Sequence, residues 1–391
     1  MNILHICLNG AVTDGLSYQD NLLPKYHKKM GLNVTVLTSL YAFDGKGKIQ
    51  KLSDEYTEYI NSDGVKIIRI PMKKGQGYNT RLKRYVGLEE VLIRECPDII
   101  FVHDFQYPDT VIIAKYLKTH KSVTAYADNH ADYSNSATSW ISKNILHRII
   151  WRYYANRLKP FITKFYGVLP ARVDFMKELY GLPDKKCELL VMGADDELAE
   201  KAAQPEVRDR IRKKYNILDD DFLVITGGKI NSYRPETLNL MQAVNESKVD
   251  RLKLLVFGSV DDSLKERFNT LCKSDRIINI GWIDSQQTYD IMAAADLIVF
   301  PGLHSVMWEQ AVGMGVPCVF KDIEGFHHVD VGGNAVFLKD VSAVSIRKTI
   351  EELASDQNKY NHMKDVATRN GMKHFSYKEI AKKSIRYEGE K

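Results

Sequence analysis

Short apolar runs alternate with amphipathic stretches along almost the whole chain, and this alternation constrains the fold more than any other feature. In the first half, the apolar runs lie at 2–8, 34–37, 67–70, 98–102, 122–126 and 165–169. The segments 17–29 and 78–95 have the periodicity of helices, and a polar loop follows residue 37. Apolar strands joined by helices are typical of a parallel, doubly wound sheet. The sequence therefore predicts an α/β protein.

The alternation is interrupted once, by the charged helical stretch ELAEKAAQPEVRDRIRKKYN, and then resumes. The later apolar runs lie at 222–226, 252–257, 277–280, 297–300 and 316–320. A chain of 391 residues is long enough for two domains. We therefore predict two Rossmann-like lobes, residues 1–195 and 196–370, with a hinge near 193–196. A final helix within 371–391 is expected to pack back on the first lobe.

Composition narrows the class of protein and its expected compartment. The 55 basic and 50 acidic residues nearly balance, so bulk charge does not indicate a nucleic-acid-binding protein. The five cysteines are dispersed without metal-ligand spacing, which predicts reduced thiols in the cytoplasm. The N-terminal MNILHICLNG does not resemble a signal peptide, and no apolar stretch is long enough to span a membrane. We expect a cytoplasmic protein whose membrane contact would be peripheral.

The second predicted lobe contains two glycines followed by two cations, in the segment GGKINSYR. Gly227 and Gly228 allow a tight turn and a close approach of a ligand to the backbone. Lys229 and Arg234 flank the start of the next predicted helix. Two cations beside a helix N-terminus fit a diphosphate clamp. The alternative is that both are solvated surface cations.

The segment FPGLHSVMWEQAVGMGVPCVF, at 300–320, places a carboxylate just beyond a strand. Ser305 is expected to be the N-cap of a short helix that runs to Val312. The free N–H groups around Ser305 and Val306 are suited to a phosphate, and Glu309 is then placed to accept hydrogen bonds from ribose hydroxyls. The alternative is that Glu309 complements the helix dipole and faces water.

These segments resemble the nucleotide-sugar lobe of the GT-B-fold retaining glycosyltransferases of family 4, also called glycosyl transferases group 1. GGKINSYR is similar to the glycine–cation turn of the family, and NIGWIDSQQTYDIMAAADLIVFPG is similar to its strand–helix–strand segment. WEQAVGMGVPCV resembles the stretch that contains the second glutamate of the family's glutamate pair. MGADDE, at 192–197, resembles its hinge. The resemblance is strong from about residue 222 to 340 and weaker before it.

The resemblance implies two Rossmann-like lobes of the GT-B type, an interlobe cleft and a retaining hexosyltransferase of the polysaccharide-assembly type. It implies transfer of a sugar from a UDP- or GDP-linked donor to a saccharide or lipid-linked saccharide acceptor. The donor would bind the second lobe and the acceptor the first. Cations and helix amides neutralise the leaving diphosphate in this family. The resemblance therefore implies no metal and no cofactor beyond the nucleotide-sugar itself.

The resemblance also assigns roles to individual positions. The implied donor-binding residues are Gly228, Lys229, Arg234, Ile283, Ser305, Val306 and Glu309. Pro301 occupies the position of the family's first glutamate, and His304 is the nearest polar substitute for a contact with the donor sugar. His130, which follows the strand 122–126, matches the histidine of the catalytic region. His103 and Gly15 are expected near the donor sugar or the acceptor, with Gly15 opening the first helix.

The segment KNILHRIIWRYYANRLKPFITK, at 143–164, combines six cations with several aromatic residues. One interpretation is an interfacial helix that lies on the inner membrane surface near a lipid-linked acceptor. The other is an ordinary helix with Ile145, Ile149 and Leu158 in the core and its cations in water.

Two other functions remain open from the sequence. A nucleotide-sugar 2-epimerase has the same two-lobe fold and would need carboxylates as acid and base. A non-catalytic sugar-nucleotide-binding protein is the other alternative, because the family's first glutamate is missing. The joint presence of Lys229, Arg234 and Glu309 favours a working donor site.

Overall fold

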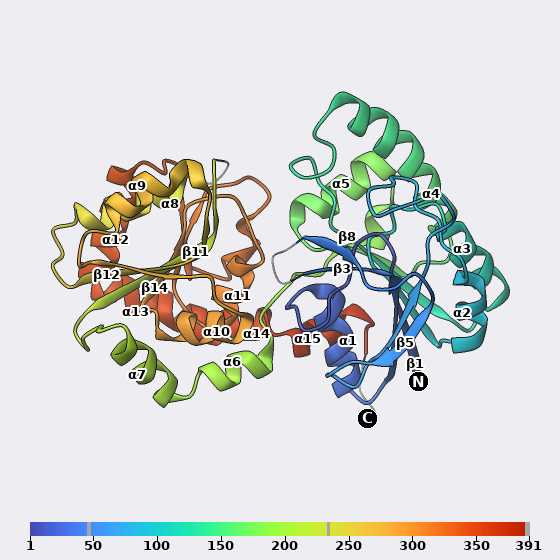
Figure 1. The fold of residues 1–391 in the computed structure, drawn as a ribbon, viewed down its shortest axis with the longest axis horizontal. Helices are drawn as coiled ribbons and strands as arrows, with labels where there is room; N and C mark the ends of the chain where they lie inside the picture. The colour runs from blue at the N-terminus through green and yellow to red at the C-terminus, as the bar shows by residue number, and fades with distance from the viewer. Residues whose placement is uncertain (45–47, 233–234, 388–391) are drawn as a thin grey trace. The chain divides into compact units, whose positions relative to one another are not determined.

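The computed structural model describes residues 1–44, 48–232 and 235–387. It divides into two compact units. Unit 1 comprises Met1–Val191 and the segment from Ile380 onward, and unit 2 comprises Met192–Glu379. Each unit is a mostly parallel sheet with helices packed on it (Figure 1), which confirms the predicted α/β class. None of the helices in the described ranges is both long and apolar enough to cross a membrane.

The sheet of unit 1 has the strand order β10-β9-β8-β7-β1-β2-β6-β5. Its strands are β1 (Asn2–Cys7), β2 (Asn33–Ser39), β5 (Thr57–Ile60), β6 (Lys66–Ile70), β7 (Ile99–Val102), β8 (Thr124–Asn129), β9 (Lys164–Gly167) and β10 (Cys187–Leu189). β5 runs antiparallel to β6, whereas β1 is parallel to both β2 and β7. The strand order reverses between β1 and β7, so their carboxyl ends form the switch point where α/β sheets bind ligands.

The helices of unit 1 pack on both faces of this sheet. They are α1 (Gln19–Lys29), α2 (Leu88–Glu95), α3 (Thr110–Thr119), α4 (Arg152–Leu158, preceded by a π-helical segment Ser142–Trp151) and α5 (Pro170–Tyr180). Alternate residues of β1 face opposite sides of the sheet. Leu4 and Ile6 join the core that includes residues of α2 to α5, whereas His5 lies against His27 of α1.

The C-terminal helix α15 (Tyr377–Ser384) lies beside α1 (Figure 1). The Nε2 atom of His27 is 3.0 Å from the carbonyl oxygen of Ala381, and the Tyr126 hydroxyl donates to the carbonyl of Ile385. These contacts attach the end of the chain to the α1 face of the sheet.

The predicted helix 78–95 is shorter in the structure, where only Leu88–Glu95 is helical. The preceding segment pairs with residues 71–73, because Lys73 N–H donates to Arg84 and Val86 N–H donates to Pro71. Gly87 then adopts a left-handed conformation (φ 92°) at the helix start, which glycine allows without strain. This antiparallel pairing provides hydrogen bonds for backbone N–H and C=O groups that would have been bonded within a longer helix.

The polar loop expected after β2 contains further strands. β3 (Tyr41–Phe43) and β4 (Ile49–Lys51) form an antiparallel ribbon, and β5 follows them. Asp44 and Lys48 close the ribbon by a backbone bond and by a Lys48 N–H···Oδ1 bond of 2.8 Å. Strands of three residues are too short to give a period-2 hydrophobic pattern, so the sequence did not predict them.

The sheet of unit 2 is parallel, with the order β13-β12-β11-β14-β15-β16. Its strands are β11 (Phe222–Ile230), β12 (Leu252–Val260), β13 (Ile277–Gly281), β14 (Leu297–Phe300), β15 (Cys318–Lys321) and β16 (Ala335–Leu338). This is the Rossmann order, in which the carboxyl ends of β11 and β14 form the switch point. The first helices of the unit are α6 (Asp196–Ala202), α7 (Pro205–Lys214), α8 (Glu236–Asn245), α9 (Lys265–Leu271) and α10 (Ser285–Ala294). They are followed by α11 (Met307–Gly313), α12 (Ala343–Ser355), α13 (Gln357–Val366) and α14 (Met372–His374).

The tight turn expected at Gly227 and Gly228 is wrong, because β11 continues through both residues to Ile230. Gly228 pairs with Gly258 of β12. A Cβ atom added to Gly258 would lie only 1.9 Å from the carbonyl oxygen of Gly228. The glycines therefore serve close strand packing at the carboxyl end of the sheet.

One interpretation of the sequence predicted that the helix of residues 142–158 buries an apolar stripe, but the structure buries only part of it. Leu158 is buried, but Ile145 and Ile149 are 40% and 58% exposed. Trp140 and Ile141, one turn earlier, are about 70% exposed. This face of unit 1 therefore presents apolar side chains to solvent.

Candidate functional site

Glu309 lies in the first turn of α11, at the carboxyl edge of the unit 2 sheet, and is fully buried. Its Oε1 atom accepts hydrogen bonds from Nε2 of His304 (2.8 Å) and Nε2 of His328 (2.9 Å). Burial raises the pKa of Glu309, but the two imidazoles outweigh burial and lower it to about 2. The alternative in which Glu309 faces water is therefore wrong.

Several atoms around Glu309 have unused hydrogen-bonding capacity. Glu309 Oε2, Trp308 Nε1 and His328 Nδ1 are buried and have no hydrogen-bond partner among the described residues. Buried polar atoms in folded proteins are nearly always paired, so these atoms are candidates for ligand contacts. Oε2 has almost no accessible surface in this structure. A ligand hydroxyl would reach it only after the atoms that cover it shift.

Gly228 and Lys229 lie on β11 next to the start of α11. A Cβ atom added to Gly228 would lie 2.8 Å from Cε of Met307, so glycine permits this close approach. Lys229 is exposed at the strand end. Arg234, the second cation of the expected clamp, lies outside the described residues. The structure therefore brings the β11 end and α11 together at the switch point.

Ser305 does not cap α11 as expected. The helix begins at Met307 with Val306 as its N-cap residue, and no side chain caps it. The carbonyl of Ser305 accepts a hydrogen bond from Trp308 N–H, and the carbonyl of Val306 accepts one from Gln310 N–H. Both residues still lie at the carboxyl edge of the sheet.

The other expected donor-site positions also lie at this edge. Ile283 is half-buried in the loop between β13 and α10. Pro301 directly follows β14, and the His304 side chain, expected near the donor sugar, is directed to Glu309. The structure thus links His304 to the carboxylate rather than leaving it open to a sugar.

In unit 1, His130 directly follows β8 and borders a cavity of about 640 Å³. Its backbone N–H donates to Oδ1 of Asp104, and its Nε2 lies 3.6 Å from Oδ2 of the buried Asp128. Burial lowers the pKa of His130, but the charges of Asp104 and Asp128 outweigh burial and raise it to about 9. His130 is therefore a cation at neutral pH, suited to donate a hydrogen bond.

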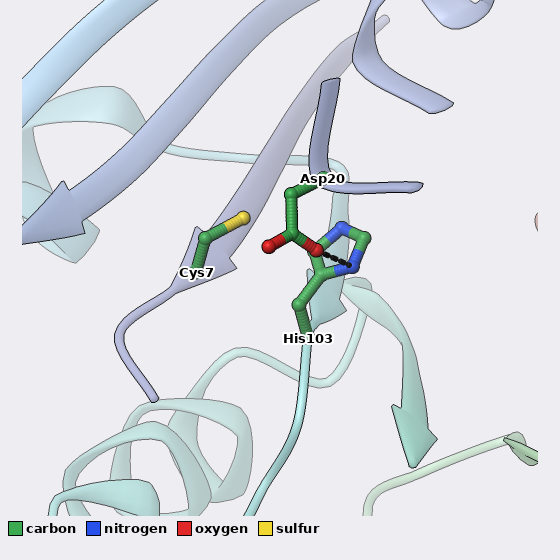
Figure 2. A group of neighbouring side chains, drawn as sticks. All are labelled: Cys7, Asp20 and His103. Atoms are coloured by element: carbon green, nitrogen blue, oxygen red, sulfur yellow. Dashed lines mark ion pairs between the residues drawn. The ribbon is translucent and has the colours of Figure 1, made fainter. Parts of the chain in front are cut away.

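His103 is buried and does not line this cavity. Its Nδ1 lies 3.0 Å from Oδ2 of Asp128 and 3.2 Å from Oδ1 of Asp20. Figure 2 shows the imidazole facing the Asp20 carboxylate, with the Cys7 thiol beside them. His103 is thus a buried partner of Asp128 and does not line the cavity, whereas the resemblance placed it near the donor sugar or the acceptor.

A chain of buried imidazoles continues from His103 to the C-terminal helix. Nε2 of His103 lies 2.9 Å from Nδ1 of His5, and Nε2 of His5 lies 2.9 Å from Nδ1 of His27. Nε2 of His27 reaches the Ala381 carbonyl and the Ser384 hydroxyl, both at 3.0 Å. The chain connects the switch point of unit 1 with α15.

Gly15 lies in an exposed loop with φ 78° and does not open the first helix, which starts at Gln19. Asn21 Nδ2 bonds the Thr13 carbonyl, which fixes this loop against α1. Three residues, 16–18, separate Gly15 from the helix start.

Two groups of side chains in the described ranges have the donor types of a metal site, namely Cys7, Asp20 and His103, and His304, Glu309 and His328. The nitrogen and oxygen set of the second group suits Zn²⁺. In both groups, however, the imidazoles face carboxylates directly. The carboxylates thus already have imidazole partners, and the expectation of a metal-free site stays a prediction.

Sequence reasoning missed His328, His5 and His27. His5 stands within the apolar strand NILHIC, and a polar residue at a buried strand position is the one signal that the sequence offered. His328 comes from a 3₁₀ turn nineteen residues after Glu309, and nothing in the sequence pattern connects the two.

Comparison with known proteins adds the family context. Residues 207–370, within unit 2, match the family model described as Glycosyl transferases group 1. The comparison with curated protein sequences found no match. A solved glycosyltransferase from Rickettsia africae shares the fold over 99% of both chains, with a TM-score of 0.70 and 14% identity.

Two further solved structures share the fold at similar levels. HepE from Anabaena, in complex with UDP, matches over 98% of both chains, with a TM-score of 0.68 and 15% identity. WaaG, a glycosyltransferase involved in lipopolysaccharide biosynthesis, matches over 100% of both chains, with a TM-score of 0.65 and 13% identity. The family match therefore covers the sheet and most helices of unit 2, and the likeness to the three solved structures shows the fold that the whole chain shares with them.

Proposed function

We propose that the chain is a retaining hexosyltransferase of the family 4 type. It would move a sugar from a nucleotide diphosphate-sugar to a hydroxyl of a saccharide or lipid-linked saccharide. The observation that carries this proposal is the meeting of Gly228, Lys229 and α11 at the switch point of a group 1 domain. HepE, which shares the fold, was solved with UDP, and WaaG is involved in lipopolysaccharide biosynthesis. HepE supports a UDP-linked donor, with GDP as the alternative, and WaaG supports a role in cell-surface polysaccharide or glycolipid assembly.

Unit 2 is the proposed donor-binding unit. Lys229, with Arg234, would neutralise the diphosphate as negative charge builds up on the leaving group, which is the main catalytic contribution of such a site. Ser305, Val306 and Ile283 would line the nucleotide. The proposed donor needs no metal or further cofactor.

Glu309 is the proposed ribose ligand of this donor site. The two histidines occupy Oε1, so Oε2 is the oxygen left to accept a ribose hydroxyl. Because Oε2 is closed off in this structure, donor binding would require the atoms that cover Oε2 to shift. The two histidines are proposed as positioning residues that keep the carboxylate ionised and oriented.

Unit 1 is the proposed acceptor-binding unit, with His130 as the catalytic residue. Protonated His130 would donate a hydrogen bond to the sugar–phosphate region as charge develops. Its basicity depends on Asp104 and Asp128, which hold it at the cavity edge.

A screen of nucleotides tests the proposal. UDP, GDP and ADP are added to the protein, and a nucleotide that binds the folded state raises its melting temperature. A rise with UDP or GDP, followed by sugar transfer from the matching donor to saccharide acceptors, is expected. No rise with any nucleotide would contradict the donor site.

The same assay separates the alternatives. Incubation with UDP-N-acetylglucosamine alone, without an acceptor, would yield a 2-epimer if the protein were an epimerase. Nucleotide binding without turnover on any donor and acceptor pair would point to a non-catalytic sugar-nucleotide-binding protein.

We also propose a peripheral contact of unit 1 with the cytoplasmic face of the inner membrane. The exposed apolar side chains of the helix 142–158 stand beside exposed Arg148 and Arg152. Apolar residues flanked by cations favour binding to an anionic lipid surface. This surface would bring the protein close to a lipid-linked acceptor.

A further inference from the structure

The cavity of about 640 Å³ beside His130 in unit 1 has walls suited to a sugar. One wall is the segment 78–83, and another runs from His130 to Trp151. Most of its lining side chains are amides and hydroxyls, with the aromatic rings of Tyr78 and Trp151 among them. Amides and hydroxyls exchange hydrogen bonds with sugar hydroxyls, and aromatic rings pack on sugar faces.

Lys83 is a buried cation in this wall. It is only 9% exposed, its Nζ contacts the carbonyl oxygen of Asn9, and it lies 4.7 Å from the centre of the Tyr78 ring. No carboxylate pairs with it within the described part of the chain. Burial lowers the pKa of Lys83, and the charge of Asp104 opposes this only in part. Buried charges are normally paired, so an anionic ligand in the cavity would supply the partner that Lys83 lacks.

Arg81 supplies a second cation to the same cavity. Both Arg81 and Lys83 line the cavity, although the chain between them bends. Burial and the charge of Arg81 together lower the pKa of His147 on the opposite wall to about 4. The field of Arg81 therefore extends across the cavity. Arg81 forms no ion pair with any described residue.

The cavity has more positive than negative charge. Asp104 is the one carboxylate among its described lining residues, and it is already bonded to the backbone of His130. Against it stand Lys83 and Arg81, whereas the charge of His130 is already faced by the buried Asp128. A neutral sugar would leave this surplus uncompensated, whereas an anionic ligand would balance it.

We propose that this cavity binds an acceptor that carries a carboxylate or a phosphate, held by Lys83 and Arg81, with its sugar hydroxyls on the polar wall. A uronic acid and a sugar phosphate supply the same chemistry here. The inference rests on the proposed function in one respect, namely that unit 1 takes the acceptor. It adds the chemical class of that acceptor.

The test measures the binding of small probes to the full-length protein, using NMR chemical shifts of the protein as the readout. The probes are glucuronic acid, glucose 6-phosphate and, as the neutral match, glucose. We expect both or one of the anionic probes to shift resonances of the cavity residues, and glucose to bind at least tenfold more weakly. The preferred anionic probe identifies the carboxylate or the phosphate as the natural group. Binding of the anionic probe should also weaken as salt is raised.

Two variants and a control locate the anion. Arg81→Gln and Lys83→Met each remove one charge and should weaken the anionic probe about tenfold or more, since bonds to charged groups are strong. Lys74→Gln changes an exposed lysine outside the cavity and should leave binding unchanged. If Lys83→Met fails to fold, Arg81→Gln decides the question alone.

Equal binding of glucose and the anionic probes, binding of none of them, or no loss in Arg81→Gln would overturn the inference. Binding of UDP and of GDP is measured in the same samples by melting temperature. Retained binding of a nucleotide with failure of the anionic probes would overturn only the acceptor class, whereas binding of neither nucleotide by the unmodified protein would contradict the proposed function.

Discussion

Glu309 illustrates how a buried, hydrogen-bonded side chain can stabilise the sheet edge at which we propose that the donor binds. Its carboxylate is buried and accepts two hydrogen bonds from imidazoles, so the ion and its partners stabilise each other. Leaving such a partner unpaired costs more than the bond itself gains. The sequence had placed Glu309 one turn into an otherwise apolar helix, but only the fold shows what surrounds it.

Replacement of this carboxylate should therefore be felt without any ligand. Glu309→Gln keeps the shape but weakens two charge-assisted bonds, each worth about 1.5–3 kcal/mol. We expect a melting temperature several degrees lower and weaker binding of UDP or GDP. The exposed Glu324→Gln is the matched control and should change neither. An unchanged melting temperature would contradict the buried ion cluster.

His130 should matter for turnover more than for donor binding. His130→Ala removes the protonated imidazole, and general acid or polarising groups contribute about 10²–10⁴-fold. We expect kcat and kcat/KM to fall together, with the donor Kd unchanged. His120→Ala, an exposed histidine of the same unit, should leave kcat unaltered. A fall in donor affinity with normal kcat would remove His130 from the catalytic role.

At the scale of elements, the imidazole chain predicts a pH-dependent attachment of α15. Burial is the main cause that lowers the pKa of His27 to about 4, although the Ala381 carbonyl opposes it. His27 therefore favours the folded state above its unfolded pKa near 6.5, and this stability is lost as pH falls through about 4. Each pKa unit corresponds to about 1.4 kcal/mol.

Melting curves between pH 7 and pH 4 test this chain. The unmodified protein should lose melting temperature steadily below pH 6.5. His27→Gln should start from a lower melting temperature at pH 7 and lose less on acidification, because glutamine does not titrate. Parallel curves for the two proteins would show that the imidazole chain does not couple to stability.

The exposed apolar side chains on and just before the helix of residues 142–158 predict that unit 1 binds anionic membranes. The protein should therefore sediment with vesicles that contain anionic lipid. The double variant Trp140→Ser, Ile149→Ser should reduce the bound fraction several-fold, since both residues are exposed. Leu218→Ser, an exposed apolar residue of unit 2, is the control. Equal sedimentation of all three proteins would contradict the proposal.

Some elements were predictable and others were not. β14 has the predicted bounds 297–300, because a short, continuous apolar run between two helices is typical of a buried parallel strand. The segment 78–87 was mistaken for a helix, because its pairing with residues 71–73 is a tertiary contact that local periodicity does not report. That error also hid Arg81 and Lys83 as cavity residues.

At the scale of the whole molecule, the predicted pair of Rossmann-like sheets follows from the strand order, and each candidate site lies at a switch point. The sequence named Lys229, Glu309 and His130 from position after strands, which is where ligands bind in such sheets. It did not find His328 or the imidazole chain, because those contacts depend on packing between distant segments.

The central claim is that the carboxyl edge of the unit 2 sheet binds the diphosphate of a nucleotide donor. Calorimetry of UDP and GDP with Lys229→Ala, Arg234→Ala and the exposed-surface control Lys213→Ala tests this most directly. Loss of one charge-assisted contact should weaken the preferred nucleotide about tenfold or more in the first two variants, with the control unchanged. Unaltered affinity in both Lys229→Ala and Arg234→Ala would contradict the account.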